Sequence, residues 1–185
     1  MIEIAVQSTP NPNALKFILN REVKAEGKVT YKGRDECASN ALACAIFNIE
    51  NVQTVHFFEN VITVSKNDSG DWEEIVDPVK LTICENIDAH DPNFKGPEEA
   101  AGKASQGETL NPELVKIEAI LDKTIRPALQ GDGGDLQVIG LEGNVLSVHY
   151  EGACGSCPSS TMGTLEAIKG ILRQEYKPDL EISAV

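Results

Sequence analysis

Two cysteines in the segment GACGSCPSS, residues 152–160, have the type and spacing of groups that bind metals or exchange disulfides. Cys154 and Cys157 are separated by two small residues, and Pro158 follows at once. The chain has five cysteines, and in a reducing compartment a spaced pair is more often metal-binding or catalytic than a structural disulfide. The segment therefore predicts metal or redox chemistry at Cys154 and Cys157.

Four kinds of site fit such a pair. A zinc site needs four ligands, and the chain has neither a second CxxC nor a histidine pair at zinc-finger spacing, so a zinc ion would have to be shared between subunits. A thioredoxin-like redox pair normally lies early in a βαβ pattern. Two buried structural cysteines fit poorly with a polar turn that contains glycines. The fourth kind is an iron-sulfur cluster, which takes four cysteine thiolates.

Ligand counting connects the iron-sulfur interpretation to a dimer. One chain supplies two thiolates, so a second copy would complete the set, with the cluster on a two-fold axis. A cluster held by two ligands per subunit should be easy to release, which is the property of a carrier. The main alternative is a thiol-disulfide oxidoreductase that uses the same pair. A third interpretation is a regulatory binding module whose N-terminal domain docks partners.

The elements of the second half predict where the pair lies. Residues 111–125 have the periodicity of a helix with Asn111 as N-cap, and Pro127 should kink or restart it. Residues 136–152 read as two strands, 159–176 as a helix and 179–185 as a last strand. The predicted order is α-β-β-α-β. We expect Cys154 and Cys157 in an exposed turn between the second strand and the second long helix.

The first half predicts a second set of strands and helices. Residues 2–7 and 14–19 read as strands around a proline-containing turn. The further predicted elements are a helix from about 35 to 48, a hairpin of 52–58 and 61–66 that turns at Glu59 and Asn60, and a closing helix in 70–87 interrupted by Pro78.

The stretch between the halves has the composition of a flexible connector. Residues 88–110 are poor in branched apolar side chains and rich in Pro, Gly, acidic and small polar residues. We therefore predict an N-terminal α+β domain of residues 1–87, a linker of 88–110, and a C-terminal α+β domain of 111–185. The fold class is α+β, with two small domains.

Segments in both halves of the chain resemble a known protein family. The segment IRPALQGDGGDLQVIGLEGNVLSVHYEGACGSCPSSTMGTLEAIKGIL resembles the C-terminal domain of the NifU/Nfu family of iron-sulfur scaffold and carrier proteins, in its GDGGD segment and its G-A-C-x-x-C-P-x-S-T run. The first half, with TPNPNALKFIL and FNIENVQTVHFFENVITVSK, is similar to the N-terminal domain of the two-domain Nfu proteins. The resemblance implies that Cys154 and Cys157 are ligands of a 4Fe-4S cluster, one per homodimer. It also implies upstream cluster donors and recipient apo iron-sulfur proteins as partners.

The other cysteines carry no predicted chemistry. Cys37 and Cys44 share one face of the predicted helix of the first half, but they would lie about 10.5 Å apart along its axis. That separation exceeds the Cα limit of about 7 Å for a disulfide. Cys84 lies in the apolar face of the closing helix. We expect all three to be small core side chains.

The histidines and the GDGGD aspartates are also expected to be structural. His56 and His149 lie in predicted strands, where a solvated or hydrogen-bonded side chain is expected, and His90 lies in the predicted linker. GDGGD lacks the lysine and the element order of a phosphate loop, so it predicts a helix stop and tight turn, with a supporting role beside the cluster as an alternative. Asp132 and Asp135 are not followed by acids at EF-hand spacing.

Composition excludes several other classes. A net charge of -13 opposes binding to nucleic acid, which needs clustered Lys and Arg. The N-terminus MIEIAVQS has neither a basic leader nor a long apolar run, which predicts no signal peptide and no membrane span. We expect a cytoplasmic protein, or a mitochondrial matrix protein whose presequence has been removed. No nucleophile elbow, Walker loop or dinucleotide motif occurs, so we do not expect an enzyme.

Overall fold

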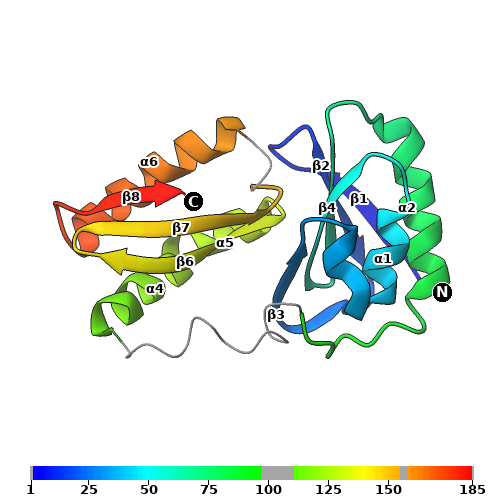
Figure 1. The fold of residues 1–185 in the computed structure, drawn as a ribbon, viewed down its shortest axis with the longest axis horizontal. Helices are drawn as coiled ribbons and strands as arrows, with labels where there is room; N and C mark the ends of the chain where they lie inside the picture. Colours follow the sequence, from blue (N-terminus) through cyan, green and yellow to red (C-terminus); the bar gives the residue numbers. More distant parts are fainter. Residues whose placement is uncertain (1, 97–110, 155–157, 185) are drawn as a thin grey trace. The chain divides into compact units, whose positions relative to one another are not determined.

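The computed structural model describes residues 2–96, 111–154 and 158–184, and for residues 158–164 the backbone only. The chain divides into two units, Met1–Gly102 and Lys103–Val185 (Figure 1). Each unit contains both helices and strands, which confirms the predicted α+β class. None of the helices in the described parts combines the length and the apolar character that a membrane crossing requires.

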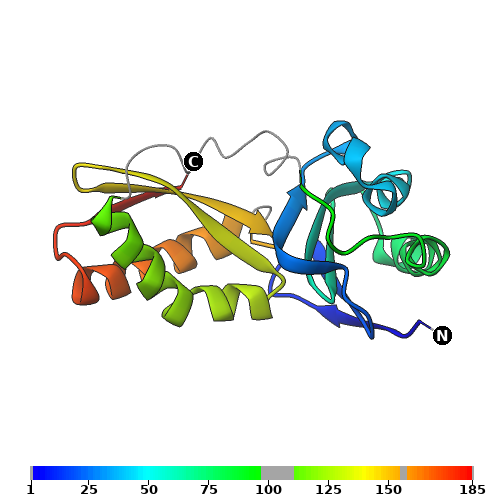
Figure 2. The same ribbon diagram turned by 90° about the horizontal axis from the view of Figure 1, so that it is seen from below.

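The first unit is a five-stranded antiparallel sheet in the order β1-β2-β5-β4-β3. Its strands are β1 (Ile4–Ser8), β2 (Ala14–Leu19), β3 (Lys24–Tyr31), β4 (Val52–Glu59) and β5 (Val61–Lys66). Helices α1 (Ala41–Phe47) and α2 (Trp72–Asn86) lie together on one face of this sheet (Figures 1 and 2). The predicted hairpin is present as β4 and β5.

The core of the first unit lies between the sheet and these two helices. Ile62 and Val64 of β5 belong to the same buried apolar cluster as Ile75, Val79 and Ile83 of α2. The strand residues recur every second position and the helix residues every fourth, so each element turns one apolar face toward the other.

One strand of this sheet has no clear signal in the sequence. β3 reads KAEGKVTY, which contains a glycine and several charged residues. Gly27 has a φ of 71°, and the pairing with β4 shifts register between Lys24 and Lys28, which is a β-bulge. A bulge breaks the two-residue alternation, so the sequence does not predict β3.

The predicted helix of residues 35–48 is two helical segments. The first, η1 (Arg34–Ser39), is a 3-10 helix, and α1 follows it. Asn40 between them is extended, with φ -136° and ψ 104°, and its side chain accepts a hydrogen bond from the Ala43 N–H at 3.0 Å. Asn40 therefore ends the first segment and caps the second.

Residues 88–96, which belong to the predicted linker, contact the strands of the first unit. The Ala25 N–H donates to the Pro92 oxygen at 3.0 Å. The Phe94 ring meets the Phe57 ring edge to face, with 5.9 Å between centroids. A segment rich in Pro, Gly and acidic residues is thus held by a backbone hydrogen bond and by the packing of Phe94 on Phe57. The rest of the predicted linker lies outside the described residues.

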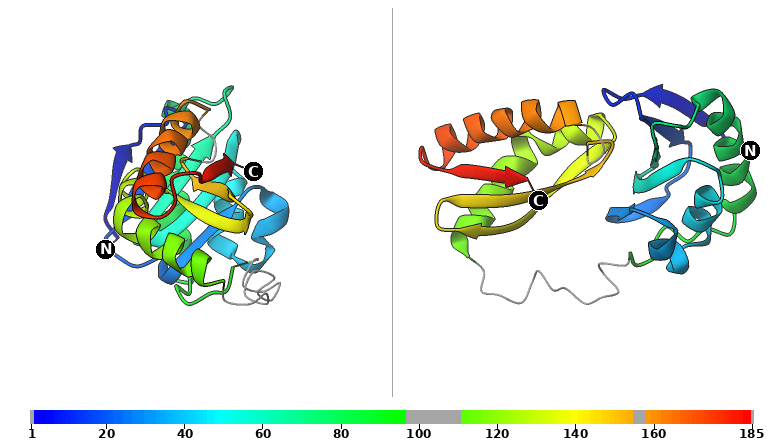
Figure 3. Two further views of the ribbon diagram at one scale, coloured as in Figure 1. Left: turned by 90° about the vertical axis from the view of Figure 1, so that its left-hand side faces the viewer. Right: turned by 45° about the horizontal axis from the view of Figure 1, so that its top comes forward.

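The second unit is a three-stranded sheet in the order β6-β7-β8. Its elements are α4 (Pro112–Thr124), α5 (Arg126–Gly131), β6 (Gly134–Glu142), β7 (Val145–Gly152), α6 (Pro158–Glu175) and β8 (Glu181–Ala184). β6 and β7 form an antiparallel hairpin, and α6 crosses over to place β8 parallel to β7 (Figure 3). The predicted α-β-β-α-β order is confirmed, and the first helix restarts at Arg126, next to Pro127.

The helices of the second unit cover one face of its sheet (Figure 2). Leu146 and Val148 of β7 share a buried apolar cluster with Ile117 and Leu121 of α4 and with Leu172 of α6. Alternate residues of β7 face the helices and form part of this core. The cysteine motif begins directly after β7 ends at Gly152.

Candidate functional site

Cys154 lies in the short connection between β7 and α6. β7 ends at Gly152, whose φ of 61° is a left-handed conformation that favours glycine. The Ala153 N–H donates to the Gly133 oxygen at 3.1 Å, which ties this connection to the start of β6. The predicted strand-to-helix turn is therefore present at Cys154, whereas Cys157 lies outside the described residues.

Gly134 is in direct contact with the Cys154 thiol. A Cβ atom at position 134 would lie 2.5 Å from the Cys154 Sγ and 2.9 Å from the Cys154 nitrogen. It would also lie 2.8 Å from the backbone oxygen of Glu151. Only a residue without a side chain fits there, because real Cβ contacts are not this short. Gly134 of the GDGGD segment therefore lies against Cys154, and a supporting role of this segment beside a cluster stays a prediction.

The predicted helix stop in GDGGD is also confirmed. α5 ends at Gly131, and the Asp132 N–H donates to the Ala128 oxygen at 3.0 Å. Gly133 follows with a φ of 79°, which again favours glycine. One short segment therefore ends a helix, turns the chain, and begins the strand that contacts Cys154.

Cys154 is buried, and not in an exposed turn as expected. Only 6% of the residue is exposed, and it belongs to the same apolar cluster as Leu129, Leu136 and Tyr150. The sequence shows a polar, glycine-rich segment around the cysteine. It does not show that β6 and the end of α5 close over the thiol.

Tyr150 brings a buried hydroxyl close to this thiol. Burial chiefly, and then the negative charge of the Cys154 thiolate, raise the pKa of Tyr150 to about 12. The hydroxyl is buried without a hydrogen-bond partner among the described residues. Sequence reasoning missed Tyr150, although it shares the inward alternation of Leu146 and Val148 and therefore had to face the core.

A network of charged and polar side chains around Arg126 contacts Asp135 of the GDGGD segment. Asp135 is buried and accepts a hydrogen bond from Gln130 Nε2 at 3.1 Å, and Arg126 Nε lies 3.6 Å from its Oδ1. Arg126 also pairs with Glu118 at 2.5 Å and with Asp122. Burial acts to lower the pKa of Arg126, but the three carboxylates outweigh it and raise that pKa. The network joins α4, α5 and β6 next to the cysteine turn.

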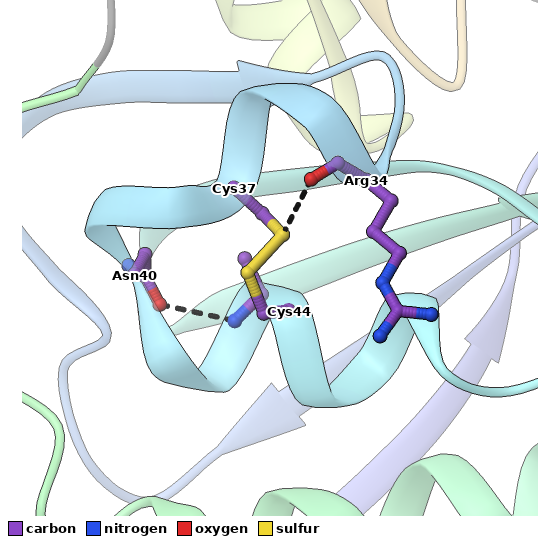
Figure 4. The surroundings of a disulfide bond; sticks show 5 residues. Arg34, Cys37, Asn40 and Cys44 are labelled. Carbon is purple, nitrogen blue, oxygen red and sulfur yellow. Dashed lines mark hydrogen bonds between the residues drawn. A yellow bond between two sulfur atoms is a disulfide. The ribbon is translucent and has the colours of Figure 1, made fainter.

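Cys37 and Cys44 form a disulfide, which contradicts the expectation that they are separate core side chains. Their Cα atoms are 5.2 Å apart (Figure 4). The expected separation of about 10.5 Å assumes one continuous helix. The extended residue Asn40 breaks that helix and brings α1 back beside η1, so the two sulfur atoms meet.

Cys84 also differs from the expectation. It is exposed on α2, and it lines a surface pocket with Arg21, Ile87 and Asp88, among others. The buried face of α2 is formed by Ile83 and its neighbours at helical spacing, and Cys84 lies one position beyond it.

Two of the histidines make hydrogen-bond contacts within the first unit. His56 Nδ1 lies 2.8 Å from Thr30 Oγ1, and His90 Nε2 lies 2.7 Å from the Val23 oxygen. His149 is half-buried in β7. Among the side chains that the structure describes, no group of three or more His, Cys, Asp or Glu residues could hold a metal ion.

Comparison with known proteins identifies the family. The family model described as the N-terminal part of the scaffold protein Nfu/NifU matches residues 4–90, and the model of the NifU-like domain matches residues 117–183. The human protein named NFU1 iron-sulfur cluster scaffold homolog, mitochondrial, is 34% identical over 179 residues, which cover 96% of this chain and 69% of that protein. The chain belongs to the Nfu/NifU family.

Two further proteins of this kind have a similar degree of sequence identity to this chain. The Drosophila persimilis protein with the same name is 34% identical, and NifU-like protein 4, mitochondrial, of Arabidopsis thaliana is 30% identical. The matches cover 96% and 91% of this chain and 63% and 61% of those proteins, so the chain spans about three-fifths of their length. Among solved structures, the NMR structure of a NifU-like protein from Saccharomyces cerevisiae covers 51% of this chain and 84% of its own, at 22% identity and a TM-score of 0.45.

Proposed function

We propose that this Nfu/NifU-family protein is an iron-sulfur cluster scaffold and carrier, which assembles or receives a cluster and transfers it to recipient apoproteins. The names of the human and Drosophila relatives support this role. The observation that carries the proposal is the cysteine turn, which lies in the segment matched by the NifU-like domain and has Gly134 against the Cys154 thiol. Such a role needs no catalytic turnover, so we propose that the protein is not an enzyme.

The ligands of the cluster would be Cys154 and Cys157. Two thiolates per chain are half of the set that a 4Fe-4S cluster requires, and the described side chains include no metal-holding group of three or more residues. We therefore propose one 4Fe-4S cluster per homodimer, with each copy contributing both cysteines. In this role the cluster is cargo that the dimer gives away.

The proposed partners follow from this role. They are upstream cluster donors and recipient apo iron-sulfur proteins, with no nucleic acid and no membrane. The curated relatives carry the word mitochondrial in their names, and we propose the mitochondrial matrix or the cytoplasm as the compartment.

Anaerobic reconstitution of the full chain tests the proposal. Iron and sulfide are added, excess reagent is removed, and visible absorbance, iron and sulfide are measured. We expect a brown protein with about four irons per two chains, which passes its cluster to an apo-ferredoxin. Cys154→Ser and Cys157→Ser should abolish loading, whereas Cys84→Ser, a change at an exposed cysteine on the other unit, should load normally.

The same preparation distinguishes the oxidoreductase alternative. A colourless protein that reduces insulin disulfides through Cys154 and Cys157 would overturn the carrier proposal. Full loading of either the Cys154 or the Cys157 variant would overturn the ligand assignment instead.

A further inference from the structure

The two cysteines of the disulfide in the first unit are buried to different extents. Cys37 lies in η1, is completely buried and belongs to the core cluster of the unit. Cys44 lies in α1 and is only partly buried. A reagent from solvent therefore meets the bond from the side of Cys44.

We propose that the Cys37–Cys44 disulfide is a thiol-exchange site, at which a small thiol of the glutathione class forms a mixed disulfide with Cys44. This site lies in a different unit from Cys154 and stands on a different observation, so it is independent of the proposed carrier function. Its ligand class follows from access: Cys44 is only partly exposed, which favours a small, flexible thiol over a protein surface.

The exchange balances as two displacements. A thiolate attacks Cys44 Sγ, a bond forms between these two sulfur atoms, and the Cys44–Cys37 bond breaks with its electron pair left on Cys37 Sγ, which takes up the equivalent of the proton that the attacking thiol released. A second small thiol then attacks the outer sulfur of the mixed disulfide and releases Cys44 as a thiol. In sum, one protein disulfide and two small thiols become one protein dithiol and one small-molecule disulfide.

A hydrogen-bond acceptor lies next to Cys37 for the thiol that the first step forms. Cys37 Sγ lies 3.0 Å from the backbone oxygen of Arg34 (Figure 4). Once the disulfide opens, the new Cys37 S–H has an acceptor in place and can donate to it without rearrangement. The Cys37 thiol released by the exchange therefore has a hydrogen-bond acceptor in its buried position.

The two helical segments also have supports other than the disulfide. Asn40 caps α1 through its bond to the Ala43 N–H, and Leu42 and Ile46 of α1 are buried in the core of the unit. The open form should therefore keep its fold, as a reversible site requires.

The test uses the full wild-type chain and reduced glutathione as the probe. The native protein is incubated with millimolar reduced glutathione, quenched with acid, denatured, and treated with a maleimide that marks every thiol. Cleavage after Arg34 and Lys66 leaves Cys37 and Cys44 on one peptide, separate from the other three cysteines. We expect this peptide to pass through a form with one glutathione and one maleimide, and fragmentation should place the glutathione on Cys44.

Two single variants provide the matched comparison. With oxidised glutathione, Cys44 in Cys37→Ser should gain an adduct at least about tenfold faster than Cys37 in Cys44→Ser, because only the first thiol is reachable. Circular dichroism of each variant shows that it is folded, and the wild-type experiment does not depend on either variant. A glutathione adduct on Cys37, equal rates in the two variants, or a disulfide that opens only after denaturation would each overturn the proposal.

Discussion

Gly134 of β6 and Cys154 of the β7–α6 turn are so close that a Cβ atom at position 134 would lie 2.5 Å from the Cys154 Sγ. The two residues are twenty positions apart in the sequence, and the β6–β7 pairing, in which Gly134 lies opposite Gly152, brings them together. The position of the candidate ligand is therefore set by a residue that has no functional group of its own.

Gly134→Ala should displace Cys154 and weaken cluster binding. The new methyl group must push away the thiol and two backbone atoms, which should cost about 1–3 kcal/mol of apo-protein stability and reduce cluster loading. Gly140→Ala, in the same strand, is the matched control because nothing lies within 4 Å of its Cβ position. Thermal melts and iron analysis of both variants test this. Equal behaviour of the two variants would show that the Gly134 contact does not position Cys154.

Serine substitutions should separate ligand chemistry from burial. Cys154→Ser should abolish loading and also destabilise the apo protein by about 1–3 kcal/mol, because it places a hydroxyl in an apolar cluster. Cys84→Ser should keep loading and change stability by less than about 0.5 kcal/mol, because Cys84 is exposed. Urea unfolding of the two apo variants measures these differences. A larger stability loss in Cys84→Ser would contradict the placement of these cysteines.

Tyr150 should give the second unit a distinct alkaline transition. Its pKa is raised from 10.0 to about 12 by folding, so between these values the folded state keeps a proton that the unfolded chain has released. The free energy of unfolding should therefore be independent of this ionisation below about pH 10 and should fall as the pH rises to about 12, by at most about 3 kcal/mol, because burial disfavours the ionised phenol.

Tyr150→Phe removes this pH dependence and provides the comparison. Below about pH 9 the variant should be as stable as the wild type or more stable by about 1 kcal/mol, because the hydroxyl it lacks has no partner in the described structure. Above that pH its stability should fall less steeply. Denaturant unfolding across this range measures both curves, and parallel curves would contradict the burial of the Tyr150 hydroxyl.

The end of the first unit should lie beyond the predicted boundary. A fragment of residues 1–96 should be more stable than one of residues 1–87, because the shorter fragment loses the packing of Phe94 on Phe57 and the Ala25–Pro92 hydrogen bond. In the full chain, Phe94→Ala should cost about 2 kcal/mol. Calorimetry of the two fragments tests the boundary, and equal stabilities would restore the linker assignment for residues 88–96.

The sequence predicts those features that depend on local periodicity. The helical periodicity of residues 111–125 predicts α4, and Pro127 marks the restart of the helix at α5. The same reasoning places Cys154 between a strand and a helix, because both neighbouring elements have strong patterns of their own.

Features that depend on a single residue or a distant contact are not predictable in this way. An extended Asn40 is enough to turn one expected helix into two and to join Cys37 to Cys44, yet it leaves the apolar periodicity unchanged. The burial of Cys154 results from β6, which pairs with β7 across a hairpin. Phe94 packs on Phe57 although it lies in a segment whose composition resembles that of a linker.

Native mass spectrometry of the anaerobically loaded full chain tests the central claim most directly, since it counts chains and clusters in the same particle. The account predicts a species of two chains with one 4Fe-4S cluster, which is absent when either Cys154 or Cys157 is changed to serine. A single chain that holds a complete cluster, or a loaded dimer that persists in both serine variants, would contradict it.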